Sequence, residues 1–299
     1  MFIVVQQVLL LLLFGAVGYI LCKTGKVKSE HTKILSVLQV YVFLPCTVVN
    51  TYSANFTVAY IREKYPLLVA SLVIMCVMVL VGDGLSRLLE KKSYLRTVYR
   101  YSLTVSNYGF FGYPLVSGLF DEVMLQNVMV FSLPIAMYAH TIGYATLTKT
   151  KISLKRFFTP VLTASLIGAA IGLTGLKIPY VLDSAVDKAA ACMAPVGMLL
   201  AGMVISEFDF ASLLKGRNNY IVAALRLLVV PCAIVGSLKL LGFDDIVIPA
   251  LMMHAMPCGL NTIVFPRLVG EDCKAGASIV LITSLLACVT VPICVVLFT

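Results

Sequence analysis

The stretch Ser106-Asn107-Tyr108-Gly109-Phe110-Phe111-Gly112-Tyr113-Pro114 interrupts an apolar segment, residues 97–120, that is long enough to cross a bilayer. Glycine and proline both weaken a helix, and Pro114 removes a backbone donor and clashes with the carbonyl four residues earlier. Within a membrane, broken helices occur only where protein or a water-filled cavity surrounds the freed backbone groups. We therefore predict a discontinuous helix here that faces the interior of a membrane protein.

A second interruption, His254-Ala255-Met256-Pro257-Cys258-Gly259-Leu260-Asn261, lies within the apolar segment 246–268. Proline, glycine and asparagine again occur together inside a segment that is otherwise able to span a membrane. Paired interruptions in the two halves of a chain are a sequence indicator of the binding site of a transporter.

The composition indicates an all-α polytopic membrane protein. The 299 residues are 60% hydrophobic and 12% charged, which is about half the charge of a soluble domain. Apolar runs of about 20 residues recur along the whole chain. They predict ten transmembrane helices at residues 3–22, 34–53, 66–89, 97–118, 123–147, 158–176, 185–206, 218–241, 246–268 and 275–298.

The distribution of Lys and Arg predicts the orientation. Seventeen of the 23 lie in the connections that follow the odd-numbered spans, and five lie in the other connections. Because positively charged loops stay in the cytoplasm, we expect both termini outside and a multi-pass protein of the cell membrane. The net charge of +9 follows from this topology, and no nucleic-acid-binding pattern accompanies it.

The chain divides into two sets of five spans, 1–148 and 158–299, joined by a basic connector at 149–157. Since five is odd, the second set enters the membrane from the opposite side, which makes an inverted repeat. Three pairs of residues in matching spans are 150, 154 and 158 residues apart: Pro45 and Pro195, Asn107 and Asn261, Pro134 and Pro292.

Enzymatic and metal-binding functions are not indicated. The sequence lacks HExxH and GxSxG motifs, and its nine cysteines form no CxxC pair. Most of these cysteines fall within apolar spans, where a thiol behaves as a small hydrophobic group. We expect no enzyme activity and no cofactor.

Four motifs resemble those of the auxin efflux carrier family, in its bacterial branch: Asn107 to Leu115, Val42 to Pro45, Ala194 to Met198, and Met256-Pro257 followed by Asn261. The resemblance implies ten helices in two inverted repeats, whose broken fourth helices (spans four and nine) cross at the membrane centre. It also implies transport of organic anions, such as auxin, malonate or malate. Spans three, four, five, eight, nine and ten would move against a scaffold of spans one, two, six and seven. Pro266-Arg267 departs from the family pattern.

The two interruptions predict an anion site. The second half of a broken helix begins with free N–H groups and a partial positive charge. Two such ends directed at one point bind an anion without a fixed cation, and Asn107 and Asn261 would add amide donors and acceptors. The alternative is that these amides only satisfy backbone groups freed by Pro and Gly. The expected substrate-binding residues at the interruptions are Asn107, Tyr108, Gly109, Pro114, Pro257, Cys258 and Asn261.

Four further polar residues are candidates, each with a structural alternative. Asn50 would face the same cavity or make an interhelical hydrogen bond. Gln126 and Tyr138 would line the pathway, or belong to the outer interface and to helix packing, respectively. His254 would couple protons or be a neutral packed residue.

The charged residues near the spans leave the coupling ion open. Arg226 lies inside span eight, where it would snorkel to the headgroups, form a structural pair or contact the substrate. Asp83 is expected to pair with Arg87, and Glu207 to lie in water. No carboxylate is placed to bind Na⁺, so coupling to H⁺, to Na⁺ or to the membrane potential alone remains open.

We therefore expect a secondary transporter for a small organic anion, a mono- or dicarboxylate, working by alternating access. The alternative is a transporter-like sensor that binds a ligand without net transport. Its partners would be the anion, the lipid bilayer and, as a homodimer, a second copy of the chain, although no GxxxG stripe was recognised.

Overall fold

The computed structural model describes residues 2–91, 93–151 and 160–298, and these residues are helical apart from short connections. Within these described residues, seven helical segments are long and apolar enough to cross a membrane. They are α1 (Phe2–Lys23), α2–η2–α3 (Thr32–Leu38, Gln39–Phe43, Leu44–Asn55), α4 (Val58–Leu89), α7–η4–α8 (Glu122–Tyr138, Ala139–Gly143, Tyr144–Leu147), α10–α11 (Tyr180–Ala191, Met193–Ile205), α13–η6–α14 (Arg217–Ala224, Leu225–Val229, Val230–Leu240) and α17 (Lys274–Phe298). A shorter apolar helix, α9, spans Pro160–Thr174.

The two interrupted segments are discontinuous in the structure, as their sequences predicted. The first consists of α5 (Ser93–Thr104), then η3 (Tyr108–Gly112) and α6 (Tyr113–Leu119). The second consists of α15 (Asp244–His254) and α16 (Asn261–Leu268). The non-helical parts are short, residues 105–107 and 255–260, so Pro114 lies within the first turn of α6 and not at the break itself.

Three π-helical turns precede prolines. The turns η2, η3 and η6 each end two residues before a proline: Pro45, Pro114 and Pro231. A proline ring clashes with the carbonyl of the preceding turn, and a π turn widens the helix at that point. The prolines are therefore accommodated without ending their helices.

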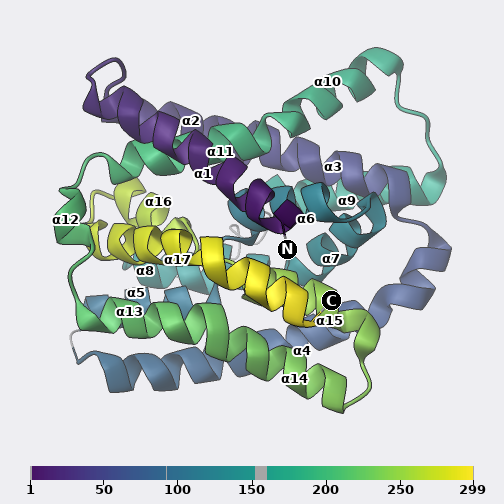
Figure 1. Cartoon of the computed structure of the whole chain (residues 1–299). Helices are drawn as coiled ribbons and strands as arrows, with labels where there is room; N and C mark the ends of the chain where they lie inside the picture. Colours follow the sequence, from purple (N-terminus) through teal and green to yellow (C-terminus); the bar gives the residue numbers. More distant parts are fainter. Residues whose placement is uncertain (1, 92, 152–159, 299) are drawn as a thin grey trace.

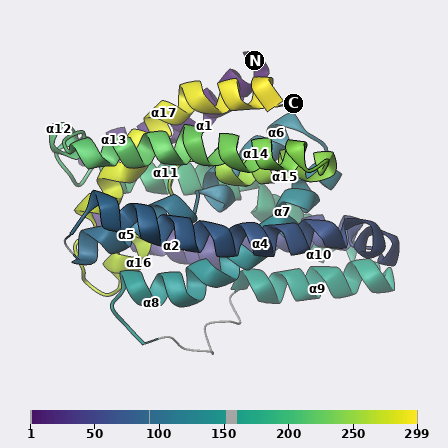
Figure 2. The same ribbon diagram turned by 90° about the horizontal axis from the view of Figure 1, so that it is seen from below.

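The helices pack in two groups (Figures 1 and 2). In the first group α1 packs on α11, and α3 packs on α9 and α10. In the second group α4 packs on α5 and α7, α14 packs on α15, and α13 packs on α17. Within the second group, α7 also packs on α15, which is the first half-helix of the second interrupted segment.

Glycines bring the backbones of α1 and α11 into direct contact. A Cβ at Gly202 would overlap the carbonyl oxygen of Gly15, and one at Gly18 would overlap that of Leu199. Close backbone approach of this kind is how small residues stabilise helix pairs in membranes.

The first group contains a GxxxG pattern that was not recognised in the sequence. Gly168 and Gly172 on α9 both face α3, and a Cβ at Gly172 would lie 2.7 Å from the carbonyl oxygens of Tyr52 and Phe56. This stripe packs within the chain, so it offers no surface to a second copy.

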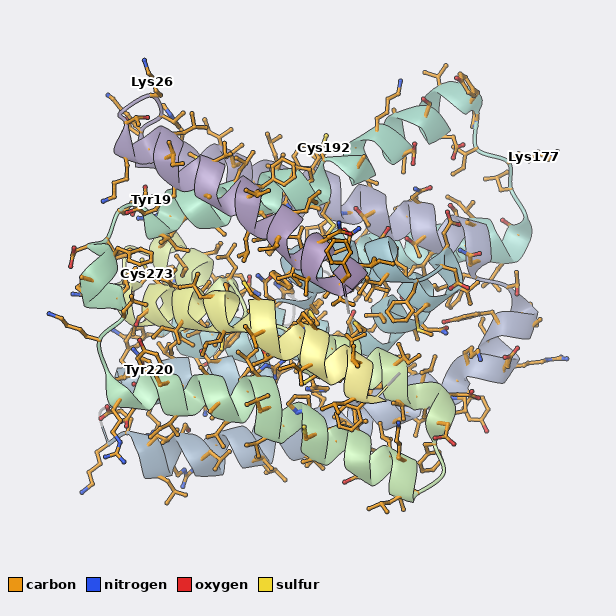
Figure 3. The ribbon with its side chains drawn as sticks, viewed as in Figure 1. Tyr19, Lys26, Lys177, Cys192, Tyr220 and Cys273 are labelled. Atoms are coloured by element: carbon orange, nitrogen blue, oxygen red, sulfur yellow. The ribbon has the colours of Figure 1, made fainter. Side chains whose placement is uncertain are left out.

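The connections alternate between two ends of the molecule. Figure 3 shows Lys26, Tyr220 and Cys273 at one end and Lys177 at the other. Lys92 and most of the predicted connector 149–157 lie outside the described residues, as do residues 158 and 159 of the sixth predicted span.

Gly202→Ala should destabilise the protein, because the added methyl group forces the backbones of α1 and α11 apart. Overpacking of this kind costs about 1–3 kcal/mol. The matched control is Gly236→Ala on α14, where a Cβ meets no atom within 4 Å. Thermal unfolding in detergent should show a lower melting temperature for Gly202→Ala than for the control, and equal melting temperatures would contradict the close contact.

Candidate functional site

The two breaks are held together by backbone pairing. Ser106 and Cys258 form an isolated antiparallel bridge, in which the amide of Asn107 donates to the Pro257 carbonyl at 2.8 Å. The amide of Gly259 donates to the Val105 carbonyl at 3.2 Å. Each break therefore satisfies backbone groups that the other leaves free, which a low-dielectric interior requires.

A cavity of about 530 Å³ lies against the paired breaks. It is enclosed by α2, η2 and α9 on one side, and by η3, η4, α8 and α16 on the other. No Lys, Arg, Asp or Glu is among its described lining residues, which are Ser36, Val37, Val40, Tyr41, Leu44, Ser106, Asn107, Tyr108, Gly109, Phe110, His140, Tyr144, Pro160, Val161, Gly259, Leu260, Asn261, Val264 and Phe265.

Both predicted asparagines line this cavity, at the beginning of a half-helix. Asn107 precedes η3 with non-helical dihedral angles, and Asn261 is the first residue of α16. The Asn107 side chain has no hydrogen-bond partner among the described residues. The Asn261 amide nitrogen lies 3.0 Å from the Tyr101 hydroxyl. Because that hydroxyl can accept or donate, Asn261 can present either amide atom to a ligand.

Gly109 widens the cavity next to Asn107. A Cβ built on Gly109 would meet no atom within 4 Å, and both Gly109 and Tyr108 line the cavity. The amides of the first helical turn have no intrahelical acceptor. The start of η3 is therefore a polar backbone surface that adjacent side chains leave open.

Four other predicted residues lie around the breaks but do not line the cavity. Pro114 is in the first turn of α6, the Pro257 carbonyl is used in the bridge, and the Cys258 amide donates to Thr283 Oγ1 at 3.1 Å. His254 ends α15, and its ring meets Phe131 edge to face; its Nδ1 has no partner among the described residues.

The structure places Asn50, Gln126 and Tyr138 away from the cavity. Asn50 donates a hydrogen bond to Asp187 Oδ1 at 3.3 Å, between α3 and α10. Gln126 is fully buried on α7, and neither of its amide atoms has a partner in the described chain. Tyr138 packs in the hydrophobic core.

Several lining residues were not singled out in the sequence. Of the four π turns in the described residues, three contribute to the cavity wall, through Tyr41 of η2, Phe110 of η3 and His140 of η4. His140 lines the cavity, and its ring lies 5.5 Å from that of Phe265. π turns are frequent at functional sites, but their positions cannot be read from composition alone.

Arg226 does not snorkel, so one of the three roles that the sequence left open is excluded. Its side chain is 0% exposed and makes three hydrogen bonds to carbonyl oxygens. Nη1 donates to Leu103 at 3.0 Å, Nη2 to Met253 at 3.2 Å and Nε to Met256 at 3.4 Å. The guanidinium thus lies at the breaks and not at the headgroups.

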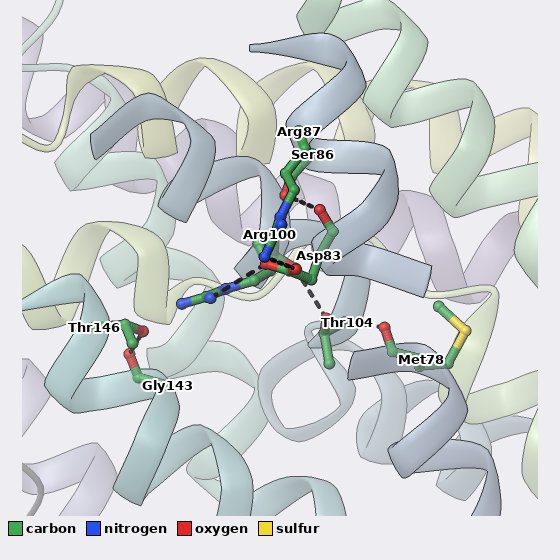
Figure 4. Close-up of polar contacts among 8 residues, drawn as sticks. All are labelled: Met78, Asp83, Ser86, Arg87, Arg100, Thr104, Gly143 and Thr146. Carbon is green, nitrogen blue, oxygen red and sulfur yellow. Dashed lines mark hydrogen bonds and ion pairs between the residues drawn. The ribbon is translucent and has the colours of Figure 1, made fainter. Parts of the chain in front are cut away.

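The expected pair of Asp83 with Arg87 is confirmed. Arg87 Nη2 lies 2.7 Å from Asp83 Oδ2, and Arg100 Nη1 lies 3.5 Å from Oδ1 of the same carboxylate (Figure 4). Thr104, at the end of α5, donates to the Arg100 carbonyl.

Glu207 does not lie free in water, contrary to expectation. It forms a two-point ion pair with Arg267, in which Nη1 lies 2.7 Å from Oε1 and Nη2 contacts Oε2. The pair joins the residues after α11 of the first group to the end of α16, which packs on α17 and α5 of the second group. It therefore connects the two helix groups. It also gives a role to the residue pair Pro266-Arg267 that departs from the family pattern.

The apolar helices indicate a multi-pass membrane protein, and comparison with known families gives its class as a transporter. A family model described as "Membrane transport protein" matches residues 3–151 and 144–295. The chain belongs to this family, which includes the auxin efflux carriers whose motifs it resembles. It is also similar to the uncharacterized transporter MJ1031 of Methanocaldococcus jannaschii, with 27% identity over 292 residues covering 93% of each chain.

The Arg267–Glu207 pair should contribute about 1–2 kcal/mol to stability, because it is two-pronged and only partly exposed. A double-mutant cycle of Arg267→Gln and Glu207→Gln, measured by unfolding in mixed micelles, should give this coupling free energy. The exposed pair of Lys28 and Glu30, 3.7 Å apart, is the control and should give a coupling near zero. Equal coupling in the two cycles would contradict the prediction.

Proposed function

We propose that this protein is a secondary transporter of a small organic anion, which it binds between the two half-helix N-termini at Asn107 and Asn261. The observation that carries the proposal is that both helix starts and both asparagines line one cavity. Free N–H groups and the positive end of the helix dipole favour an anion there. No fixed cation lines the described part of the cavity, so these groups supply the attraction.

The rest of the cavity favours a substrate with an apolar body. Tyr41, Phe110, Tyr144 and Phe265 contribute aromatic side chains to the wall. A volume of about 530 Å³ is within the range of pockets for small organic ligands. A monocarboxylate fits this distribution better than a dicarboxylate, because its single charge is at the breaks and its remainder contacts apolar side chains.

Alternating access would move the two helix groups against one another, with the cavity at their boundary. If the chain has ten spans, α1 and α3 belong to its first half, and α9 and α11 belong to its second half. The helix α1 packs on α11, and α9 packs on α3. This reciprocal pairing supports two inverted repeats whose broken helices cross. The positive-inside rule would place the cavity toward the cytoplasm, since Ser36 and Tyr144 lie near the connections 24–31 and 148–151.

The membrane potential would favour export. An anion leaving an inside-negative cell gains about 2.3 kcal/mol per charge at 100 mV. Uptake would therefore need a steep concentration gradient.

Asn107→Ala and Asn261→Ala should each weaken carboxylate binding about 10- to 100-fold, because a hydrogen bond to a charged group contributes about 1.5–3 kcal/mol. The measurement is a thermal-shift titration of the purified protein with a panel of mono- and dicarboxylates. Asn50→Ala is the matched control, since Asn50 bonds to Asp187 outside the cavity. If a carboxylate stabilises all four proteins equally, the anion site is elsewhere.

Counterflow in proteoliposomes distinguishes a carrier from a sensor. If the protein is a carrier, proteoliposomes loaded with unlabelled carboxylate should transiently accumulate labelled carboxylate from outside. Asn107→Ala should reduce this accumulation. Saturable binding without counterflow would favour the sensor.

Gly109→Leu should abolish binding without loss of stability, because its side chain would extend into the open space next to Asn107. Gly84→Leu on α4 is the control, where a Cβ also meets no atom within 4 Å. The expected result is a melting temperature close to that of the wild type for both variants, with carboxylate binding retained only by Gly84→Leu. Wild-type affinity in Gly109→Leu would show that the substrate does not occupy this part of the cavity.

A further inference from the structure

Arg226 is a buried cation at a place where carbonyl oxygens converge. Its three acceptors belong to the end of α5 (Leu103), the end of α15 (Met253) and the second break (Met256). Leu103 and Met253 lie at the C-terminal ends of the two first half-helices, just before the breaks, where the polarity is opposite to that of the helix starts at Asn107 and Asn261. The guanidinium is therefore bound to the negative ends of both first half-helices at once.

No acidic side chain accompanies this cation. None of the ion pairs among the described residues includes Arg226, and no group of three His, Cys, Asp or Glu in this part of the chain is placed to hold a metal ion. A buried charge is strongly unfavourable unless it is paired and hydrogen-bonded. Its compensation comes from the carbonyls and from the negative ends of two helix dipoles.

Carbonyls at unwound segments and half-helix C-termini are the ligands that bind coupling cations such as Na⁺ in carriers with broken helices. We propose that Arg226 is a tethered cation that occupies this position permanently, so that the protein binds and moves its anion without a coupled metal cation. The transport part of this inference rests on the proposed function, whereas the binding part rests on the contacts of Arg226 alone.

The chemistry of arginine suits this role. A guanidinium remains charged when buried, and its five N–H donors lie in one plane. Three of its nitrogen atoms reach three different segments, which no single ammonium group would do with the same geometry. Arg226 does not line the cavity, so it is a positioning residue that fixes the breaks and does not contact the substrate.

Removal of the guanidinium should create a dependence on added cations. Arg226→Gln should have a lower melting temperature than the wild type in choline buffer, and methylguanidinium or Na⁺ at matched ionic strength should restore part of the difference. The wild type should melt at the same temperature in Na⁺, K⁺ and choline. Arg226→Lys keeps the charge, and should remain insensitive to cations. Lys239→Gln, at the exposed end of α14, is the control for loss of one positive charge and should respond to none of them.

Transport provides the second measurement. Carboxylate counterflow by the wild type should be unchanged when Na⁺ is replaced by choline, whereas Arg226→Gln should lose at least tenfold and regain activity with methylguanidinium. The proposal is overturned if the wild type requires Na⁺, or if Arg226→Gln transports and melts like the wild type without added cations. A partial loss that no cation restores would also overturn it, since it would indicate a packing role only.

The two proposals fail in different ways. If no carboxylate binds to the wild type, the proposed function fails, but the cation dependence of melting still tests Arg226. Should Arg226→Gln not fold, Arg226→Lys and Arg226→Ala extracted in methylguanidinium decide the question. Folding of Arg226→Ala only in the presence of that ion would support the tethered cation, and its failure to fold in any cation would count against it.

Discussion

The backbone pairing between the two breaks is the constraint on which the site depends. Two interrupted helices in a low-dielectric interior must satisfy their free amides and carbonyls, and the bridge between Ser106 and Cys258 does this for the central residues. The pairing also determines which backbone groups lie on each side of the two breaks. Helix starts and their N–H groups are directed at the cavity, while helix ends and their carbonyls surround Arg226. One arrangement of the backbone thereby accounts for both the proposed anion site and the group of carbonyls around Arg226.

The breaks could be predicted because their causes are local. Glycine, proline and asparagine inside an apolar run weaken a helix wherever they occur, and two such runs at matching places indicate one shared site. Asn107 and Asn261 were recognised for the same reason. The role of Arg226 could not be predicted in this way, because whether a long side chain reaches the headgroups depends on neighbours that are distant in sequence. Leu103 and Met256 are 123 and 30 residues away from it.

Other parts of the site depend on tertiary structure for similar reasons. His140, Tyr144 and Phe265 are ordinary residues of apolar segments until η4, α8 and α16 bring them to one wall. Glu207 follows a span and carries a charge, which suggested exposure, but Arg267 lies opposite it only because two helix groups meet there. The GxxxG pattern of α9 was missed in the sequence, because two glycines four residues apart mark a helix contact only once their partner, here α3, is known.

The glycines mark two kinds of contact between helices. At some glycines the backbone of another helix lies against them, and at others a side chain does. Gly202 of α11 meets the backbone of α1, and Gly172 of α9 meets the backbone of α3, so these helices of the first group are held in close contact. Where the groups face each other, a side chain lies on a glycine instead: Gln7 on Gly118, and Phe110 on Gly197. A glycine surface has no side chain to interlock with its neighbour and resists sliding less than interdigitated residues do. Displacement along this boundary would therefore leave the backbone contacts within the first group intact.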